Sequence, residues 1–163
     1  MSGPERPFRV LFVCTGNTCR SPMAAGALRK ELGAESGQVE ISSAGTAAWE
    51  DQPATPDAVA VAAEDGVDLG AHRSRRVTAQ LLQGADLVLV MEKGQAGTVL
   101  GLGADKSRTH VLSEWPEPGE PGLPVSDPFG ASREAYEECW RRIRHHVKRL
   151  LPSVREALRT RSM

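Results

Sequence analysis

Four short runs of β-branched and aliphatic residues recur along the chain and predict buried strands. They occupy residues 9–13 (RVLFV), 39–43 (VEISS), 85–91 (ADLVLVM) and the stretch around 109–113 (THVLS). Short runs of this kind are typical of strands in a parallel sheet, because helices cover both faces of such a sheet. The pattern therefore predicts a parallel sheet of four strands.

Segments with helical signals separate these runs. Ser-Pro and Thr-Pro are strong helix starts, and glycine is a common helix stop. These signals predict helices at residues 21–33 and 55–66, a short helical turn from Thr78, and a weaker helix at 94–103. Strands that alternate with helices predict an α/β fold: a single three-layer domain with a four-stranded parallel sheet flanked by helices and joined by right-handed crossovers.

The C-terminal part of the chain begins with a segment that regular structure cannot accommodate. Residues 114–127 (EWPEPGEPGLPVSD) hold four prolines, two glycines and four acids, which predicts a surface loop leading into Asp127 and Pro128. A final helix follows, because apolar residues recur there at steps of four and three: Tyr136, Trp140, Ile143, Val147 and Leu150. Residues 1–163 are expected to form one domain, with frayed ends at 1–8 and 159–163.

Composition and charge exclude several classes of protein. A chain of 163 residues with 40% hydrophobic content suits one globular domain, and a net charge of -1 does not indicate a nucleic-acid partner. No apolar run approaches the roughly 20 residues that span a bilayer, and the start MSGPERPFRV lacks a signal-peptide core. We therefore expect a cytoplasmic protein. Three cysteines, an odd number, argue against a framework of disulfides.

The candidate chemistry lies in residues 13–21, VCTGNTCRS, directly after the first predicted strand. A strand that passes through a glycine-containing loop into a helix N-terminus directs several backbone N–H groups at one point, which makes a cradle for an anion. Five residues separate Cys14 from Arg20, enough for the loop to encircle a phosphate. The sulfur then faces phosphorus, and the guanidinium holds two oxygens. The positive field of the cradle favours the nucleophilic thiolate.

Other residues of this loop have expected supporting roles. Gly16 permits a turn that other residues resist, and Asn17 tolerates a left-handed conformation. Ser21 is expected both to cap the helix and to donate to the Cys14 sulfur. The reaction also needs a group that protonates the leaving atom, and Asp127 is the candidate because the loop before it delivers it to a defined place.

Three other interpretations of the loop are poorly supported. Cys14 and Cys19 are too far apart for the usual spacing of zinc ligands, so no metal site is predicted. A structural disulfide does not suit a cytosolic protein. A nucleotide-binding loop would require a lysine that is absent here.

The segments VCTGNTCRSPMA, ISSAGT and DPFG together resemble the low-molecular-weight protein tyrosine phosphatase family. The resemblance runs from Arg9 to about Leu151. It implies a two-step hydrolysis without metal or cofactor, in which Cys14 takes the phosphoryl group, Arg20 and the loop amides hold its oxygens, and Asp127 protonates the leaving group and then activates water. The phosphate-binding residues that it implies are Thr15, Gly16, Asn17, Thr18, Cys19 and Arg20.

The same resemblance implies roles for further residues. Ser21, Ser43 and His72 match the network that supports the loop together with Asn17. Cys19 matches a second cysteine that forms a reversible disulfide with Cys14 and protects it from overoxidation. The implied partners are phosphorylated proteins, with inorganic phosphate as the product. We expect a monomer that binds neither nucleic acid nor membrane.

Thr18 and Phe129 depart from the commonest tyrosine-specific pattern. That pattern has an aliphatic residue at the first position and two aromatics after Asp-Pro, whereas here Phe129 precedes Gly130. Both changes resemble the bacterial protein-arginine phosphatase branch. A hydroxyl at Thr18 can pair with the polar guanidinium of phosphoarginine, so we expect phosphoarginine ahead of phosphotyrosine, the alternative substrate. Trp49 is expected at the cleft mouth, where it can stack on a substrate side chain.

Two other functions share features with this sequence. Arsenate reductase uses a related fold but needs a pair of additional cysteines, and only Cys139 is left in this chain. A phosphate-binding or redox module that does not catalyse hydrolysis would use Cys14 and Cys19 alone. Hydrolysis of an aryl phosphate that depends on Cys14 separates this module from an enzyme.

Overall fold

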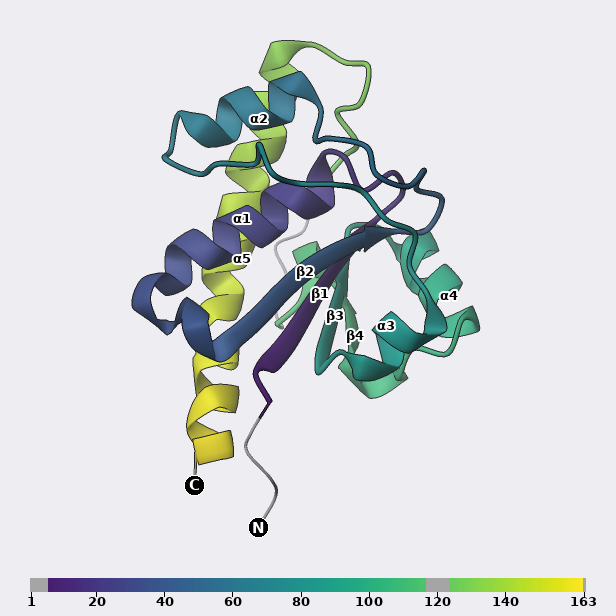
Figure 1. Cartoon of the computed structure of the whole chain (residues 1–163), viewed down its shortest axis with the longest axis vertical. Helices are drawn as coiled ribbons and strands as arrows, with labels where there is room; N and C mark the ends of the chain where they lie inside the picture. Colours follow the sequence, from purple (N-terminus) through teal and green to yellow (C-terminus); the bar gives the residue numbers. More distant parts are fainter. Residues whose placement is uncertain (1–5, 117–123, 163) are drawn as a thin grey trace.

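A sheet of four parallel strands forms the centre of the protein, in the order β2-β1-β3-β4 (Figure 1). The computed structural model describes residues 6–116 and 124–162. The strands are β1 (Phe8–Cys14), β2 (Val39–Gly45), β3 (Leu87–Val90) and β4 (Thr109–Val111). This arrangement confirms the predicted α/β fold with its four-stranded parallel sheet.

Helices cover both faces of the sheet (Figure 1). One face packs against α1 (Arg20–Leu32) and α5 (Arg133–Ser162), and α2 (Pro56–Ala63) packs on these two helices. The other face packs against α3 (Ala79–Gly84) and α4 (Lys93–Gly101). Short 3₁₀ helices are η1 (Gly33–Gln38), η2 (Lys106–Arg108) and η3 (Leu112–Glu114). Because successive side chains of a strand point to opposite faces, Val10 and Phe12 of β1 join the first layer, while Leu11 and Val13 join the second.

The last helix is longer than the sequence predicted. The predicted apolar stripe from Tyr136 to Leu150 is buried as expected. Val154 and Leu158 continue it at steps of four, and both are buried. The helix therefore extends to Ser162, so residues 159–162 are helical rather than frayed. Residues 117–123 of the predicted proline-rich loop lie outside the described part of the chain.

The outer edge of β2 is held by arginine side chains. Arg29 donates to the carbonyl of Ile41 at 2.7 Å, and the Nε–H of Arg75 donates to the carbonyl of Ser43 at 3.1 Å. Gly45 donates its backbone N–H to the carbonyl of Arg75 at 2.9 Å. The segment that contains Arg75 is thus fixed beside the end of β2, where the candidate site begins.

Within residues 6–116 and 124–162, no helix is long and apolar enough to cross a membrane.

Candidate active site

The loop predicted to hold an anion connects β1 to α1 at the carboxyl end of the sheet. Cys14 is the last residue of β1, and Arg20 is the first residue of α1. Both side chains are buried, with 3% and 2% of their surface exposed. Ligands of parallel α/β sheets bind at this end of the strands, so the loop occupies the expected place.

The Cys14 sulfur lies among hydrogen-bond donors. The Ser21 hydroxyl is 3.0 Å from Cys14 Sγ, and the backbone N–H of Asn17 donates to the same sulfur at 3.2 Å. Donors directed at sulfur stabilise its anionic form. The predicted capping role of Ser21 is wrong, because α1 begins at Arg20, its N-cap is Cys19, and no side chain caps it. The Ser21 hydroxyl contacts Cys14 and Asn17 instead.

Asn17 is the centre of the network that shapes the loop. It is fully buried and has a φ of 57°, in the left-handed region that asparagine tolerates. Its side-chain amide donates to Ser21 Oγ at 2.8 Å and to Ser43 Oγ at 2.9 Å, and its Oδ1 accepts from the backbone N–H of Arg75 at 2.9 Å. Segments far apart in the sequence therefore converge on one side chain.

Gly45, at the end of β2, lies directly against the loop. A Cβ at this position would lie 2.4 Å from the backbone oxygen of Thr15 and 2.8 Å from Cβ of Ala48. The first of these neighbours is backbone and cannot move aside cheaply. The close approach of β2 to the loop therefore requires glycine.

Arg20 and Asp127 meet at the same place, as the sequence predicted. Arg20 Nη2 lies 3.8 Å from Asp127 Oδ2, and Arg20 Nη1 donates to the carbonyl of Val125 at 3.1 Å. The other carboxylate oxygen of Asp127 accepts from the backbone N–H of Phe129 at 3.1 Å. This bond and Pro128 fix the direction of Asp127, whose side chain remains 47% exposed. A carboxyl group that solvent and a ligand can both reach is suited to proton transfer.

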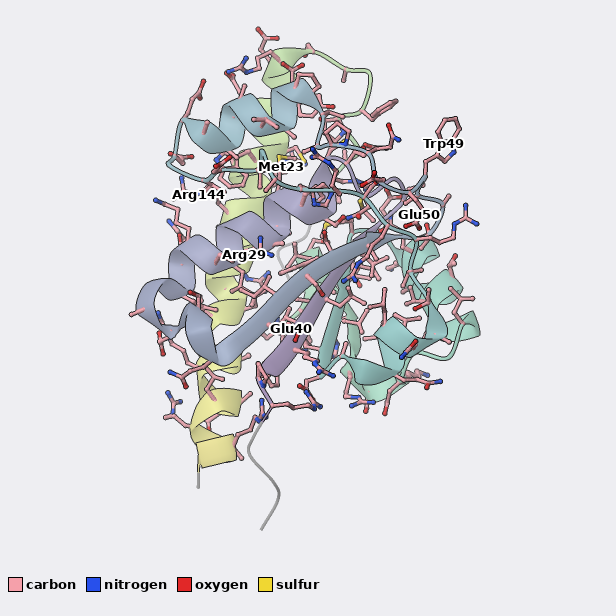
Figure 2. The ribbon with its side chains drawn as sticks, in the orientation of Figure 1. Met23, Arg29, Glu40, Trp49, Glu50 and Arg144 are labelled. Atoms are coloured by element: carbon pink, nitrogen blue, oxygen red, sulfur yellow. The ribbon has the colours of Figure 1, made fainter. Side chains whose placement is uncertain are left out.

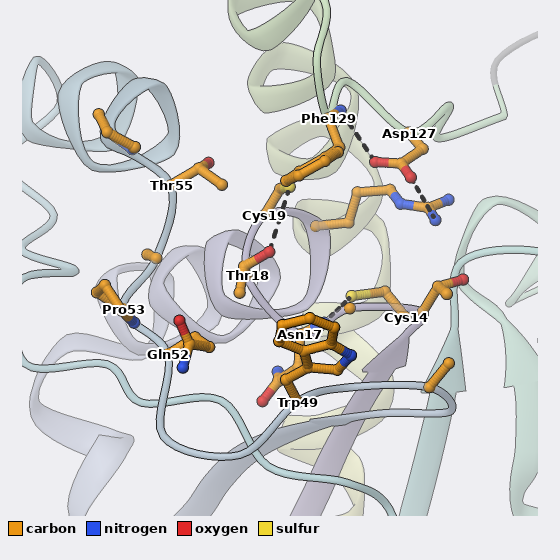
Figure 3. Close-up of a pocket in the computed structure, with 16 residues that line it drawn as sticks. Cys14, Asn17, Thr18, Cys19, Trp49, Gln52, Pro53, Thr55, Asp127 and Phe129 are labelled. Atoms are coloured by element: carbon orange, nitrogen blue, oxygen red, sulfur yellow. Dashed lines mark hydrogen bonds and ion pairs between the residues drawn. The ribbon is translucent and has the colours of Figure 1, made fainter.

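A pocket of about 520 Å³ opens over the loop (Figure 3). Its floor is formed by residues 14–20, and its walls include Trp49, the segment 52–56, Asp127 and Phe129. Every residue predicted to catalyse, to bind phosphate or to select the substrate therefore lines one cavity. The sequence did not identify Gln52, Pro53, Ala54 and Thr55 as wall residues.

A sequence profile described as low molecular weight phosphotyrosine protein phosphatase matches residues 9–160. The chain belongs to this family. It is therefore a hydrolase, a low-molecular-weight protein phosphatase of the kind that includes tyrosine and arginine phosphatases.

Relatives of this phosphatase carry both specificities in their names. A protein-arginine-phosphatase of Geobacillus stearothermophilus is 37% identical over 156 residues, which cover 94% of this chain and 98% of the relative. The probable low molecular weight protein-tyrosine-phosphatase EpsP of Ralstonia nicotianae is 35% identical over 147 residues, covering 90% and 95%. The solved structure of the YwlE arginine phosphatase from G. stearothermophilus superposes with a TM-score of 0.83 at 33% identity, covering 93% and 95%.

Two site residues of this phosphatase were missed by the sequence analysis, and both follow β3. Glu92 forms an ion pair with Arg20. Gln95 donates from Nε2 to the Thr15 hydroxyl at 3.0 Å, while its Oε1 accepts from the backbone N–H groups of Met91 and Glu92 at 2.8 and 3.0 Å. The start of α4 thus holds both ends of the phosphate loop. The position of Glu92 and Gln95 directly after a central strand is the sequence signal that points to them.

His72 supports the loop from the backbone side. Its Nε2 lies 2.7 Å from the carbonyl oxygen of Asn17. Since a carbonyl only accepts, Nε2 carries the proton of this bond. Burial lowers the pKa of His72, and the nearby charges of Arg29, Arg73 and Arg75 lower it further, although the bond to Asn17 opposes them. The neutral imidazole is therefore the form that the folded protein favours.

This depressed pKa predicts that the phosphatase loses stability in mild acid. Below the ordinary histidine pKa of 6.5, the unfolded chain takes up a proton that folded His72 resists, so the free energy of unfolding falls as pH falls. We expect His72→Gln to flatten this dependence, because glutamine can still donate to Asn17 but does not titrate. Urea unfolding at about pH 7.5 and about pH 5.5 measures the difference.

His110 provides the comparison for that experiment. Burial also lowers the pKa of His110. His110→Gln should therefore also weaken the dependence of the free energy of unfolding on pH, and the double variant should weaken it more than either single variant. A His72→Gln variant with the pH dependence of the parent would contradict the expectation.

The three cysteines of the phosphatase are all free thiols within the described residues. Cys19 is buried, and its sulfur lies 3.8 Å from the Tyr136 hydroxyl. Burial raises the pKa of the Cys19 thiol, and it raises the pKa of Cys139 to about 12. Both thiols are therefore held in the protonated form in the resting protein.

Proposed function

We propose that this protein hydrolyses phosphorylated side chains of proteins through a phosphocysteine intermediate, with phosphoarginine as the favoured substrate. The observation that carries the mechanism is the convergence of Cys14, Arg20 and Asp127 on one pocket. Cys14 Sγ accepts from the loop, and the Arg20 guanidinium and the Asp127 carboxylate are 3.8 Å apart. Nucleophile, anion-binding group and proton donor are therefore all within reach of one phosphoryl group.

In the first step, the Cys14 thiolate attacks phosphorus. A P–S bond forms, the P–N bond of phosphoarginine or the P–O bond of phosphotyrosine breaks, and Asp127 gives its proton to the departing atom. The loop N–H groups and Arg20 hold the equatorial oxygens as charge builds on them. In the second step, water attacks phosphorus and gives its proton to the Asp127 carboxylate. The P–S bond breaks, releasing inorganic phosphate and restoring the thiolate.

Thr18 supports the preference for phosphoarginine. It lines the pocket, and the only hydrogen-bond partner of its hydroxyl within the described residues is Cys19 Sγ at 3.9 Å, a weak partner. This hydroxyl is therefore available to a guanidinium, whose N–H groups would otherwise lose their hydrogen bonds on entering the pocket. Gly130, which follows Phe129, has a φ of 77°, a conformation that disfavours a second aromatic at that position.

Phosphotyrosine is the second candidate, and the walls of the pocket favour it. Trp49, Pro53, Ala54 and Phe129 are apolar surfaces against which a phenol ring can pack. The name of the Ralstonia relative points to the same substrate.

A Thr18→Ile substitution separates the two candidates. If Thr18 pairs with the guanidinium, the parent prefers phosphoarginine, and the variant loses about tenfold in kcat/KM for phosphoarginine peptides relative to phosphotyrosine peptides. The measurement is kcat/KM for both peptides with both proteins. Thr160→Ile, on the exposed side of α5, makes the same chemical change away from the pocket and should leave the ratio unaltered. A parent that prefers phosphotyrosine, or a ratio indifferent to Thr18→Ile, would refute the preference.

Cys19 is proposed as the redox partner of Cys14. Its support is that both cysteines line the same pocket. Oxidation of the Cys14 thiolate by a peroxide would give a sulfenic acid. Attack of the Cys19 sulfur, whose proton leaves with the sulfenic hydroxyl as water, would then give a disulfide that a thiol reductant can reverse.

A further inference from the structure

Two exposed aromatic side chains stand on either side of the pocket. Trp49 is 79% exposed and Phe129 is 67% exposed, and both line the cavity. Figure 3 shows them on opposite sides of Thr18, and Figure 2 shows Trp49 projecting away from the body of the protein. In the described part of the chain the only other exposed large hydrophobic side chain is Leu102, at 42%. Exposed aromatics gathered at a pocket mouth indicate a surface that a partner covers.

Carboxylates accompany both aromatics. Trp49 is followed by Glu50 and Asp51, and Phe129 is two residues after Asp127. The segments 46–55 and 124–132, which carry these residues, contain no lysine or arginine. One oxygen of Glu50 accepts from the backbone N–H of Arg76 at 2.7 Å. The Asp51 carboxylate has no ion-pair partner among the residues that the structure describes. An aromatic face beside carboxylates is suited to a cationic side chain.

The segment around Trp49 is held in place before any partner arrives. Ser74 is buried, and its hydroxyl donates to the carbonyl of Trp49 and accepts from the backbone N–H of Gln52 at 2.9 Å. The carbonyl of Ser74 accepts from the backbone N–H of Asp51 at 2.8 Å. Asp51 itself has a φ of 65°. A surface fixed in this way loses little conformational entropy on binding.

We propose that Trp49, Glu50, Asp51 and Phe129 form a docking surface for arginine or lysine side chains that flank the phosphorylated residue of the substrate. The inference rests on the proposed function and specifies its substrate class further: phosphorylated segments of basic character. The phosphorylated side chain enters the pocket, and a neighbouring cation lies over the indole of Trp49 within reach of the Asp51 carboxylate. Phe129 packs against the segment from the other side.

Three arginines close to Trp49 in the fold would favour the opposite preference, a substrate with acidic flanks. Arg73 precedes Ser74, and Arg75 and Arg76 follow it, so an acidic flank has possible partners as well. Arg75 is half-buried and engaged with Ser43, and the Arg73 guanidinium donates to the carbonyl of His72. Arg76 is exposed, and its guanidinium has no hydrogen bond or ion pair among the described residues, so it would favour an acidic flank where Asp51 favours a basic one.

The test compares three peptides that carry the same phosphorylated residue with flanking arginines, serines or glutamates. We expect kcat/KM to be about threefold to tenfold higher with arginine than with serine flanks, and lower still with glutamate. The advantage should shrink as salt rises, because exposed charges are screened. Equal rates for all three peptides, or a preference for glutamate, would overturn the docking proposal. Failure to hydrolyse any of the peptides would instead overturn the proposed function.

Substitutions on the docking surface test whether it causes the preference for arginine flanks. Asp51→Asn removes the charge and keeps a residue that tolerates positive φ, and it should lower the arginine-to-serine ratio at least twofold. Trp49→Ala, at an exposed position, should lower it further. Glu40→Gln makes the same charge change on β2, where Glu40 pairs with Arg9 at 3.5 Å, and should keep the parental ratio. A ratio that falls equally in Glu40→Gln and Asp51→Asn would contradict the assignment.

Discussion

Replacement of Cys14 by serine is expected to lower kcat for an aryl phosphate by about 10⁴-fold or more, while inorganic phosphate still binds. The serine hydroxyl is a far weaker nucleophile than a thiolate. The groups that contact Cys14 Sγ, the Ser21 hydroxyl and the Asn17 backbone N–H, cannot remove its proton. Phosphate affinity depends on Arg20 and on the loop N–H groups, which the substitution leaves in place. Steady-state kinetics and calorimetric titration with phosphate measure the two effects separately.

Cys139→Ala is the matched control for this substitution. Cys139 is buried on α5 and lies outside the pocket, so its replacement should retain activity. Substantial hydrolysis by the Cys14→Ser variant would exclude the phosphocysteine mechanism. If the parent protein itself does not hydrolyse aryl phosphates, a phosphate-binding or redox module is favoured instead.

Asp127→Asn is expected to slow turnover by about 10²- to 10⁴-fold without weakening the binding of phosphate. An amide cannot protonate the leaving atom. The same substitution removes a negative charge 3.8 Å from the guanidinium that holds the phosphate, so the affinity for phosphate should be unchanged or slightly higher. The loss should be smaller for p-nitrophenyl phosphate than for phenyl phosphate, because a good leaving group needs less protonation.

The dependence on the leaving group distinguishes proton transfer from a structural role. Asp105→Asn makes the same change at η2, where Asp105 accepts from the backbone N–H of Ser107 at 2.8 Å, and should leave both rates near those of the parent. Equal losses for both leaving groups, or weakened phosphate binding with normal turnover, would contradict the acid role of Asp127.

The sequence located the strands because their pattern is local, but it misplaced several ends. β3 was predicted at 85–91 and spans Leu87–Val90. Ala85 caps the end of α3, and the Asp86 side chain accepts from the backbone N–H of Arg9 at 2.8 Å. The bond between Asp86 and Arg9 joins elements that are distant in the sequence, so no window of neighbouring residues could reveal it.

The two long helices show how packing overrides local signals. Pro152 lies inside α5 and should interrupt it by local rules. The buried side chains of Val154 and Leu158 nevertheless continue the apolar stripe past it. At the start of α1, Ser21 has the composition of a cap, yet its hydroxyl is engaged with Cys14 and Asn17.

The active site also combines residues that are close in the sequence with residues that only the fold brings together. Cys14 and Arg20 lie within one short motif, so their proximity was predictable from spacing. Glu92 reaches Arg20 across 72 residues, and Gln95 reaches Thr15 across 80. Without the packed sheet, nothing in the segment MEKGQ indicates that it faces the phosphate loop. Only its position after an apolar strand hinted at a functional role.

The arginines along β2 have a consequence for behaviour at high concentration. An edge strand with free carbonyls can pair with a strand of another molecule and begin aggregation. Here Arg29 and Arg75 occupy the carbonyls of Ile41 and Ser43, and the backbone beside Arg75 occupies Gly45. An incoming strand would have to displace these bonds one after another. The contacts that align β2 with the phosphate loop therefore also protect the protein from self-association along this edge.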